Sequence, residues 1–372
     1  MPVKCRDIMA ELELLAPKHL AEDWDNIGLL LGSPEQDIHK ILVTLDVDQA
    51  VVAEAVATGA NMLVSHHPLL FKGITNIRTD SAAGSMLAAL LKNDIAVYAA
   101  HTNLDSAAGG VNDVLAQKLN LQGVVPLSTV YQEQLHKLVV FVPASHLEKV
   151  RTAMTAAGAG HIGNYSHCTF QTRGTGTFLP LAGTTPFIGE QNKLEYVEEY
   201  RLETIMPTEI RSQVIRAMIA AHPYEEVAYD EYLLVNPGPR SGLGRVGNLS
   251  EPTTLASFVA EVKTALGIHS LKAAGPGNAV INKVAICGGS GAGLVKNALK
   301  AGAQALVTGD VKYHDAQAAV AAGLCIVDAG HFATEQPVVA RVVDYLSQCA
   351  GKKHWNIPII ASKTNQDVFT TY

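Results

Sequence analysis

The hydrophobic pattern of the chain predicts alternating strands and helices in two separate stretches. In the first stretch, short apolar runs at residues 41–45, 61–65 and 95–99 predict buried strands. Between these runs, alanine and valine recur at helical spacing, and Gly59 follows the first helical segment as a stop signal. Strands and helices that alternate in this way are typical of a parallel sheet in an α/β fold.

The second stretch repeats this plan nearer the other end of the chain. Strands are expected at residues 283–287, 305–308 and 324–328, again with helical segments between them. When residues 52–65 are laid against residues 295–308, a Gly-Ala pair, a Leu-Val pair and a hydroxyl residue coincide at a constant offset. We therefore predict two related α/β lobes that face each other, with a site at the carboxyl ends of their strands.

The middle of the chain breaks this pattern. Its extended and helical segments follow in the order β–α–β–β–α–β, which is the order of the ferredoxin-like split motif. Ser145 is expected to cap the first of these helices, and residues 236–245 have the composition of a linker. We predict one discontinuous domain, with lobes at residues 1–130 and 241–372, and an inserted α+β domain at residues 131–240.

Composition narrows the class of protein. Of the 372 residues, 48% are hydrophobic and 17% are charged, which is typical of a globular protein with a sizeable core. The net charge of -7 and the lack of a Lys/Arg run argue against general nucleic-acid binding. Neither a membrane span nor a signal peptide is predicted. The five cysteines are widely spread, which favours buried reduced thiols and hence a cytoplasmic protein.

Histidines and carboxylates follow several of the predicted strands. A His-x-x-x-acid pattern occurs twice, as His101 with Asp105 and as His331 with Glu335. If a helix starts just after the strand, His331 and Glu335 share one helical face and can bind one cation. Imidazole and carboxylate together are the ligands that zinc, manganese or iron prefer.

Two further histidines, His66 and His67, end the predicted strand at residues 61–65. Neighbouring residues of a regular strand point to opposite faces, so both bind in one cluster only if the chain turns there or if two metals are bridged. Two metals, about 3.5–4 Å apart as in many hydrolases, satisfy the ligand count better than one. The predicted ligands are His66, His67, Asp105, His331 and Glu335. The sequence leaves three roles open for His101: a metal ligand, a residue that orients a ligand, or a proton shuttle.

Other residues at strand ends are candidates for the same cleft. Asp310 and His314 are candidates to line it, although Asp310 is equally suited to cap the following helix, and Asp25 is either a wall of the pocket or a helix cap. The run at residues 288–293 approaches a dinucleotide-binding motif and a serine-hydrolase elbow. A tight strand–helix turn explains these small residues without either chemistry.

Six motifs in the two outer segments form a specific combination. They are Trp24-Asp-Asn-Ile-Gly-Leu-Leu-Leu-Gly32, Ser65-His-His-Pro-Leu-Leu-Phe-Lys-Gly-Ile74, His101-Thr-Asn-Leu-Asp105, Gly244-Arg-Val-Gly-Asn-Leu249, Thr308-Gly-Asp-Val-Lys-Tyr-His-Asp-Ala-Gln317 and Gly330-His-Phe-Ala-Thr-Glu335. Together they resemble the Nif3-like family, whose members are often labelled GTP cyclohydrolase 1 type 2 homologues. The resemblance implies two similar lobes, a dinuclear site on the five ligands above, and a toroidal homohexamer with its sites facing the central cavity. Longer members carry a middle domain similar to the PII and CutA1 proteins, and residues 131–240 look like that domain.

The activity that this resemblance implies is hydrolysis with two divalent cations per subunit. Its most concrete form is GTP cyclohydrolase-like, in which water opens the guanine imidazole ring and formate leaves. Zinc is the favoured metal, with iron or manganese as alternatives, and His101 is the candidate for proton transfer. The sequence keeps two alternatives open: a metal-dependent nucleotide or phosphoester hydrolase, and a non-catalytic metal-binding or regulatory ring.

Overall fold

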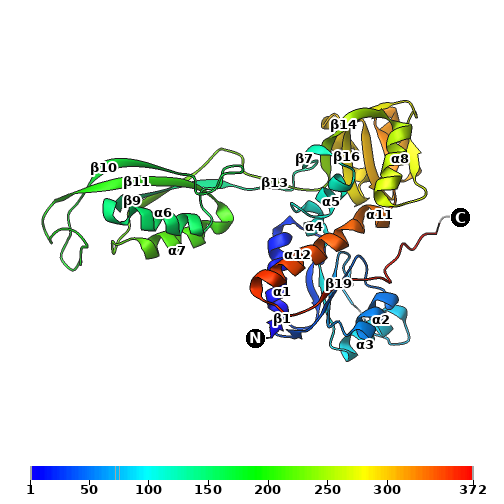
Figure 1. Ribbon diagram of the computed structural model, residues 1–372, viewed down its shortest axis with the longest axis horizontal. Helices are drawn as coiled ribbons and strands as arrows, with labels where there is room; N and C mark the ends of the chain where they lie inside the picture. The colour runs from blue at the N-terminus through cyan, green and yellow to red at the C-terminus, as the bar shows by residue number, and fades with distance from the viewer. Residues whose placement is uncertain (1, 72, 75, 371–372) are drawn as a thin grey trace. The chain divides into compact units, whose positions relative to one another are not determined.

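The structure is a computed structural model that describes residues 2–71, 73–74 and 76–370. The chain divides into two compact units. The larger unit combines residues 1–131 with residues 241–372, and the smaller unit is Gln132–Arg240, drawn in green in Figure 1. Two short strands, β8 (Tyr131–Gln132) and β13 (Arg240–Ser241), lie at the boundaries between these units. None of the described helices is both long enough and apolar enough to span a membrane.

The first sheet of the larger unit has five strands in the order β19-β4-β5-β6-β2. Its parallel centre is β4 (Ile41–Thr44), β5 (Met62–Ser65) and β6 (Ala96–Ala99), with β19 (Ile359–Ala361) parallel to β4 and β2 (Gly28–Leu31) antiparallel to β6. All residues of the three central strands are buried, as expected for a parallel sheet with both faces covered. A small two-stranded sheet, β1 (Val3–Lys4) with β3 (Asp37–Ile38), accompanies this lobe.

Local sequence sets the ends of the connecting helices. The side chain of Asp48 accepts a hydrogen bond from the backbone N–H of Val51 and so begins α2 (Gln49–Thr58). Gly59 ends α2 with a φ of 72°, a conformation that costs glycine little, which confirms the predicted stop. Ser81 caps α3 (Ala82–Lys92) in the same way as Asp48 caps α2.

The second sheet of the larger unit has six strands in the order β15-β18-β17-β16-β14-β7. The parallel centre is β16 (Val280–Ser290), β17 (Ala305–Gly309) and β18 (Cys325–Asp328), connected through α9 (Val295–Lys300) and α10 (Tyr313–Ala321). The antiparallel strands are β7 (Gln122–Pro126), β14 (Arg245–Thr254) and β15 (Lys272–Ala274), and α8 (Leu255–Leu266) follows β14. The parallel centres of both sheets have the same connectivity and order, which confirms the prediction of two related α/β lobes.

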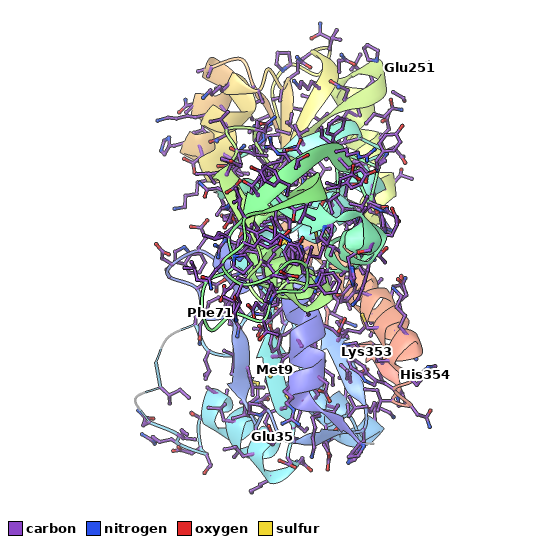
Figure 2. All side chains as sticks on the ribbon, turned by 90° about the vertical axis from the view of Figure 1, so that its left-hand side faces the viewer. Met9, Glu35, Phe71, Glu251, Lys353 and His354 are labelled. Carbon is purple, nitrogen blue, oxygen red and sulfur yellow. The ribbon has the colours of Figure 1, made fainter. Side chains whose placement is uncertain are left out.

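Five helices complete the larger unit: α1 (Cys5–Leu15), α4 (Thr102–Ser106), α5 (Val111–Lys118), α11 (His331–Glu335) and α12 (Pro337–Lys353). Figure 1 shows α4, α5 and α11 between the two sheets. Apolar residues of α1 and α12 belong to one buried cluster with those of β4, β5 and β6. Lys353, seen with His354 at the C-terminal end of α12 in Figure 2, forms an ion pair with Glu11 of α1.

The predicted linker at residues 236–245 extends too far toward the C-terminus. Arg245 begins β14 and is only 3% exposed. Its Nε donates to Asp113 Oδ1 at 2.5 Å, and its Nη1 donates to the carbonyl oxygens of Gly242 and Gly244 at 2.7 and 2.9 Å. Composition predicted a linker because glycine and proline dominate the segment, but the arginine at its end is a buried anchor.

The smaller unit has a four-stranded antiparallel sheet in the order β10-β11-β9-β12. Its elements are β9 (Leu135–Pro143), α6 (Leu147–Ala156), β10 (Thr169–Phe178), β11 (Glu195–Pro207), α7 (Arg211–Ala221) and β12 (Tyr229–Leu233). Apolar residues of α6 and α7 pack with alternate residues of β9 and β11, including Val140 and Leu202. The likeness of this unit to the PII and CutA1 proteins stays a prediction.

The predicted cap at Ser145 is wrong. The chain enters α6 through a 3-10 turn, Ala144–His146, so the residue that precedes α6 is His146. The hydroxyl of Ser145 contacts His146 Nδ1 at 2.9 Å and no backbone N–H of the helix.

Candidate metal centre

Six residues that the sequence singled out come together in the larger unit. His66 and His67 directly follow β5, and His101 directly precedes α4, which carries Asp105. The remaining two, His331 and Glu335, are the first and last residues of α11. Their donor atoms form three overlapping groups, each with all atoms within 4.8 Å of one another: His66, Asp105 and Glu335; His67, His331 and Glu335; and His66, His67 and His101.

Glu335 belongs to the first two of these groups and gives each a different oxygen. Its Oε1 lies 3.8 Å from His66 Nε2, which is itself 3.6 Å from Asp105 Oδ1. Its Oε2 lies 3.1 Å from both His67 Nε2 and His331 Nε2, and those two nitrogens are 3.3 Å apart. A carboxylate placed in this way can bridge two cations, one in each group.

The end of β5 explains how adjacent histidines share one cluster. The backbone N–H of His66 and of His67 still bonds to the lobe's sheet, at the carbonyl oxygens of Thr44 and Leu45. Regular strand geometry nevertheless stops at Ser65, and the two imidazole rings lie 4.9 Å apart, centroid to centroid. The chain therefore departs from the strand at this point, as the following proline suggested.

Each of the four clustered histidines is oriented by an oxygen at its Nδ1. The pairs are His66 with the carbonyl oxygen of Ala100 at 2.9 Å, His67 with Asp46 at 2.7 Å, His101 with Asp25 at 2.9 Å and His331 with Asp310 at 2.6 Å. Because these oxygens can only accept, each Nδ1 carries a hydrogen, so the neutral form of each ring has its lone pair on Nε2. This arrangement, in which a partner oxygen fixes the tautomer and the ring, is usual around metal-binding histidines.

The three aspartates of these pairs differ in how well the sequence indicated them. Asp25, predicted as a wall of the pocket or a helix cap, instead orients His101 and accepts a hydrogen bond from the backbone N–H of Thr102, the first residue of α4. Asp310 does not cap α10, whose N-cap is Lys312, and it contacts His331 instead. Asp46 was missed, although its place after the strand at residues 41–45 fits the rule that located the others.

His314 and the run at residues 288–293 supply no donor to the three groups. His314 lies in α10, where its Nδ1 contacts Gln317, and it belongs to none of the donor groups. A serine triad would need Asp328 beside His331, yet the Asp328 carboxylate accepts hydrogen bonds from the backbone N–H of Val311 and Gly330. Gly289 makes room for the cluster, because an added Cβ would lie 2.1 Å from Glu335 Oε1.

The metal-free cluster is electrostatically unusual. Burial lowers the pKa of His67, but the adjacent carboxylates of Asp46 and Glu335 outweigh this and raise the pKa to about 10. The adjacent Glu335 carboxylate likewise raises the pKa of His331 to about 9. Burial raises the pKa of Asp105 to about 6, although His66 opposes the shift. Protons on the imidazoles therefore balance the buried carboxylates, and a bound cation would displace them.

Three buried atoms of the cluster also lack a hydrogen bond. Among the described residues, nothing is placed to hydrogen-bond His66 Nε2, Asp105 Oδ1 or Glu335 Oε2 with acceptable geometry. A buried polar atom without a partner costs about 1–3 kcal/mol, so such atoms call for an explanation. All three point into the donor groups, and a divalent cation in each would satisfy them. The residues present thus fit a metal centre.

Comparison with known proteins gives a consistent result. The family model described as Duf34/NIF3 (NGG1p interacting factor 3) matches residues 3–368. Two relatives are called GTP cyclohydrolase 1 type 2 homolog: one from Halalkalibacterium halodurans, 45% identical over 96% of both chains, and one from Bacillus subtilis, 43% identical over 99% of this chain and 98% of that one. A Bacillus cereus protein related to NIF3 has a solved structure with a TM-score of 0.93 and 45% identity, and the match covers 100% of both chains.

Proposed function

Since the chain belongs to the Duf34/NIF3 family, we propose that it is a cytoplasmic hydrolase that works with two divalent cations and opens the imidazole ring of a guanine nucleotide such as GTP. The observation that carries the proposal is the position of Glu335, whose two oxygens serve two separate donor groups. Each group supplies three protein donors, which leaves coordination positions for water and substrate. Zinc is the metal that we propose first, and the mixed histidine and carboxylate donors suit zinc, iron and manganese alike.

The bound cations would supply a water molecule whose pKa is lowered toward neutrality. The chain's own residues position the rest of the reaction. Asp25 holds Nδ1 of His101, and this leaves Nε2 free to accept or release a proton beside the cluster. Burial alone would raise the pKa of Asp25, but its hydrogen bonds with His101 and Thr102 hold that pKa at about 2, so it stays an anion that orients the ring.

Two exposed aromatic side chains beside His101 suit a planar base. Trp24 and Phe71 are 64% and 57% exposed, and the ring centroid of each lies 5.9 Å from that of His101. Exposed aromatic rings are surfaces on which nucleobases stack. This favours a purine substrate over a simple phosphoester.

The test is product analysis by mass spectrometry after GTP is incubated with protein loaded separately with zinc, manganese and ferrous iron. We expect formate and a ring-opened triphosphate, both absent with His331→Ala. His314→Ala is the matched control, because this histidine lies outside the donor groups. Free phosphate instead would reassign the protein to nucleotide hydrolysis. Full metal occupancy without any product from GTP would refute the proposed activity and favour the non-catalytic ring.

We further propose that the subunits form a homohexameric ring with the metal centres facing its cavity. Support comes from the family resemblance described above. Six chains of 39.4 kDa give a mass of about 236 kDa, which light scattering coupled to size-exclusion chromatography would detect. A monomer or dimer over the micromolar range would refute the hexamer without bearing on the metal centre.

A further inference from the structure

A second candidate site lies in the smaller unit, within Gln132–Arg240. A cavity of about 400 Å³ opens there between the sheet and the connection from β10 to β11. Small-molecule sites are usually concave, mostly apolar and about 300–1,000 Å³ in volume. Since all of its lining residues belong to the smaller unit, this cavity is separate from the metal-donor residues.

Aromatic rings form much of the cavity wall. Tyr224 has Phe178 on one side and Phe187 on another, with ring centroids 6.0 and 6.2 Å from its own. Phe187, a large apolar residue, is 50% exposed and lies near the middle of the connection between β10 and β11. A group of aromatic faces around one space is the arrangement that attracts an organic cation.

A buried carboxylate adds negative charge to this aromatic wall. Glu199 is 8% exposed and lies on the face of β11 opposite to Leu202, which packs against the helices. Its Oε1 accepts a hydrogen bond from the Tyr224 hydroxyl at 2.9 Å. Its Oε2 lies against Gly176, where an added Cβ would be only 2.1 Å away. The glycine thus leaves the space in which the carboxylate lies beside the cavity.

The charge of the cavity is one-sided. Glu225 and Glu226 line it together with Glu199, and the described lining residues include no lysine or arginine. Two histidines contact this aromatic wall: the ring centroid of His222 lies 4.9 Å from that of Tyr224, and that of His146 lies 5.4 Å from that of Phe187. Burial lowers the pKa of His222, which favours its uncharged form. A buried carboxylate without a basic partner is costly, and a bound cation would reduce that cost.

We propose that this cavity binds a small organic cation, namely a primary or quaternary ammonium compound with an apolar body. The ammonium group lies against Glu199 and the ring of Tyr224. The apolar body lies against Phe178, Phe187 and Phe141, which also line the cavity. This site goes beyond the proposed hydrolase and does not depend on it.

The test measures binding to the full-length protein by isothermal titration calorimetry with four probes. Benzyltrimethylammonium and phenethylamine are the cations, phenethyl alcohol is the neutral analogue and phenylacetate is the anion. The quaternary probe matters because its nitrogen has no lone pair and cannot bind a metal. We expect both cations to bind, the alcohol to bind at least ~5-fold more weakly, and the anion not to bind.

Variants locate the site. Glu199→Gln should weaken binding of both cations at least ~10-fold, since it removes the charge and keeps the shape. Glu198→Gln is the matched control, because that neighbour on β11 is exposed and pairs with Arg173 on the other face. Phe187→Leu replaces a half-exposed ring, so folding is preserved, and it should reduce the preference for the cations over the alcohol. Equal binding of cation and alcohol, unchanged affinity in Glu199→Gln, or no binding of either cation at millimolar concentration would each overturn the proposal.

Discussion

His331 and Glu335 show how one turn of helix can supply ligands to a metal. They stand at the first and last positions of α11, so their side chains lie on one face and His331 Nε2 is 3.1 Å from Glu335 Oε2. The same spacing in α4 places Asp105 in the other donor group, while His101 stands just before that helix. The same His-x-x-x-acid spacing therefore places both residues in one donor group when the helix begins at the histidine, and in different groups when the helix begins one residue later.

The first prediction concerns the ligand His331. His331→Ala removes one of three donors from its group, so the purified protein should retain about one metal ion per chain or fewer. Inductively coupled plasma mass spectrometry on dialysed protein measures this content. His314→Ala should match the unmodified protein. Full metal content in His331→Ala would show that the cation lies elsewhere.

A second prediction concerns Asp46, which touches no cation itself. Its carboxylate orients His67, so Asp46→Asn should weaken metal affinity by about 10–100-fold while the fold is kept. Competition with a chromophoric chelator gives the affinity. Asp94→Asn, at an exposed position, is the control. If both variants bind metal equally well, the hydrogen bond between Asp46 and His67 has no part in metal binding.

At the scale of elements, the glycines at the end of β16 bring that strand close to α11. The backbone N–H of Gly289 donates to Thr334 Oγ1 at 3.0 Å, and its own φ is 59°. No other residue fits this position, because a Cβ would collide with Glu335 and would also be strained at that φ. The small residues thus serve the packing of a strand against a ligand-bearing helix.

Gly289→Ala should therefore displace the Glu335 carboxylate. We expect a loss of metal affinity. We also expect the free energy of unfolding to decrease by about 1–3 kcal/mol, which lowers the unfolding temperature. Gly293→Ala is a matched control within residues 288–293, because a Cβ there would meet nothing within 4 Å and the φ of Gly293 is not positive. Calorimetric unfolding with and without added zinc measures both effects. The argument fails if the two alanine variants behave alike.

The elements themselves were largely predictable, and the reasons are physical. The central strands are buried on both faces, so they read as continuous apolar runs, and Asp48, Gly59 and Ser81 mark helix ends by local hydrogen bonds or backbone conformation. The cap at Ser145 failed because a 3-10 turn shifts the helix start, which no side-chain pattern reveals. Asp46 was missed because its role depends on β4 lying beside β5, and neighbouring strands are not specified by local sequence.

At the scale of the whole molecule, a carboxylate pair makes stability depend on pH. Burial, together with the neighbouring Glu209, raises the pKa of Glu133 in the smaller unit from 4.5 to about 7. Between pH 4.5 and about 7, Glu133 keeps its proton in the folded chain and releases it in the unfolded chain. The contribution of Glu133 to stability should therefore fall as pH rises from about 4.5 to 7 and stay constant above that range.

Urea unfolding followed by circular dichroism at several pH values checks this dependence. Glu133→Gln removes the titrating group, so it should be more stable than the unmodified protein at pH 7.5 and differ little from it at pH 4.5. Equal differences at both pH values would mean that the substitution acts through packing rather than through the proton.

The order of the ligands along the chain has a consequence for biosynthesis. Asp105 leaves the ribosome more than 200 residues before His331, and the whole smaller unit is synthesised between them. Because Glu335 completes both donor groups, a nascent chain cannot hold either cation with its full ligand set until α11 has emerged. The first lobe therefore folds before either of these two donor groups is complete, with only the group of His66, His67 and His101 assembled within it. Metal capture then becomes a late event that joins the two lobes, and cellular metal shortage should slow the maturation of finished chains rather than their synthesis.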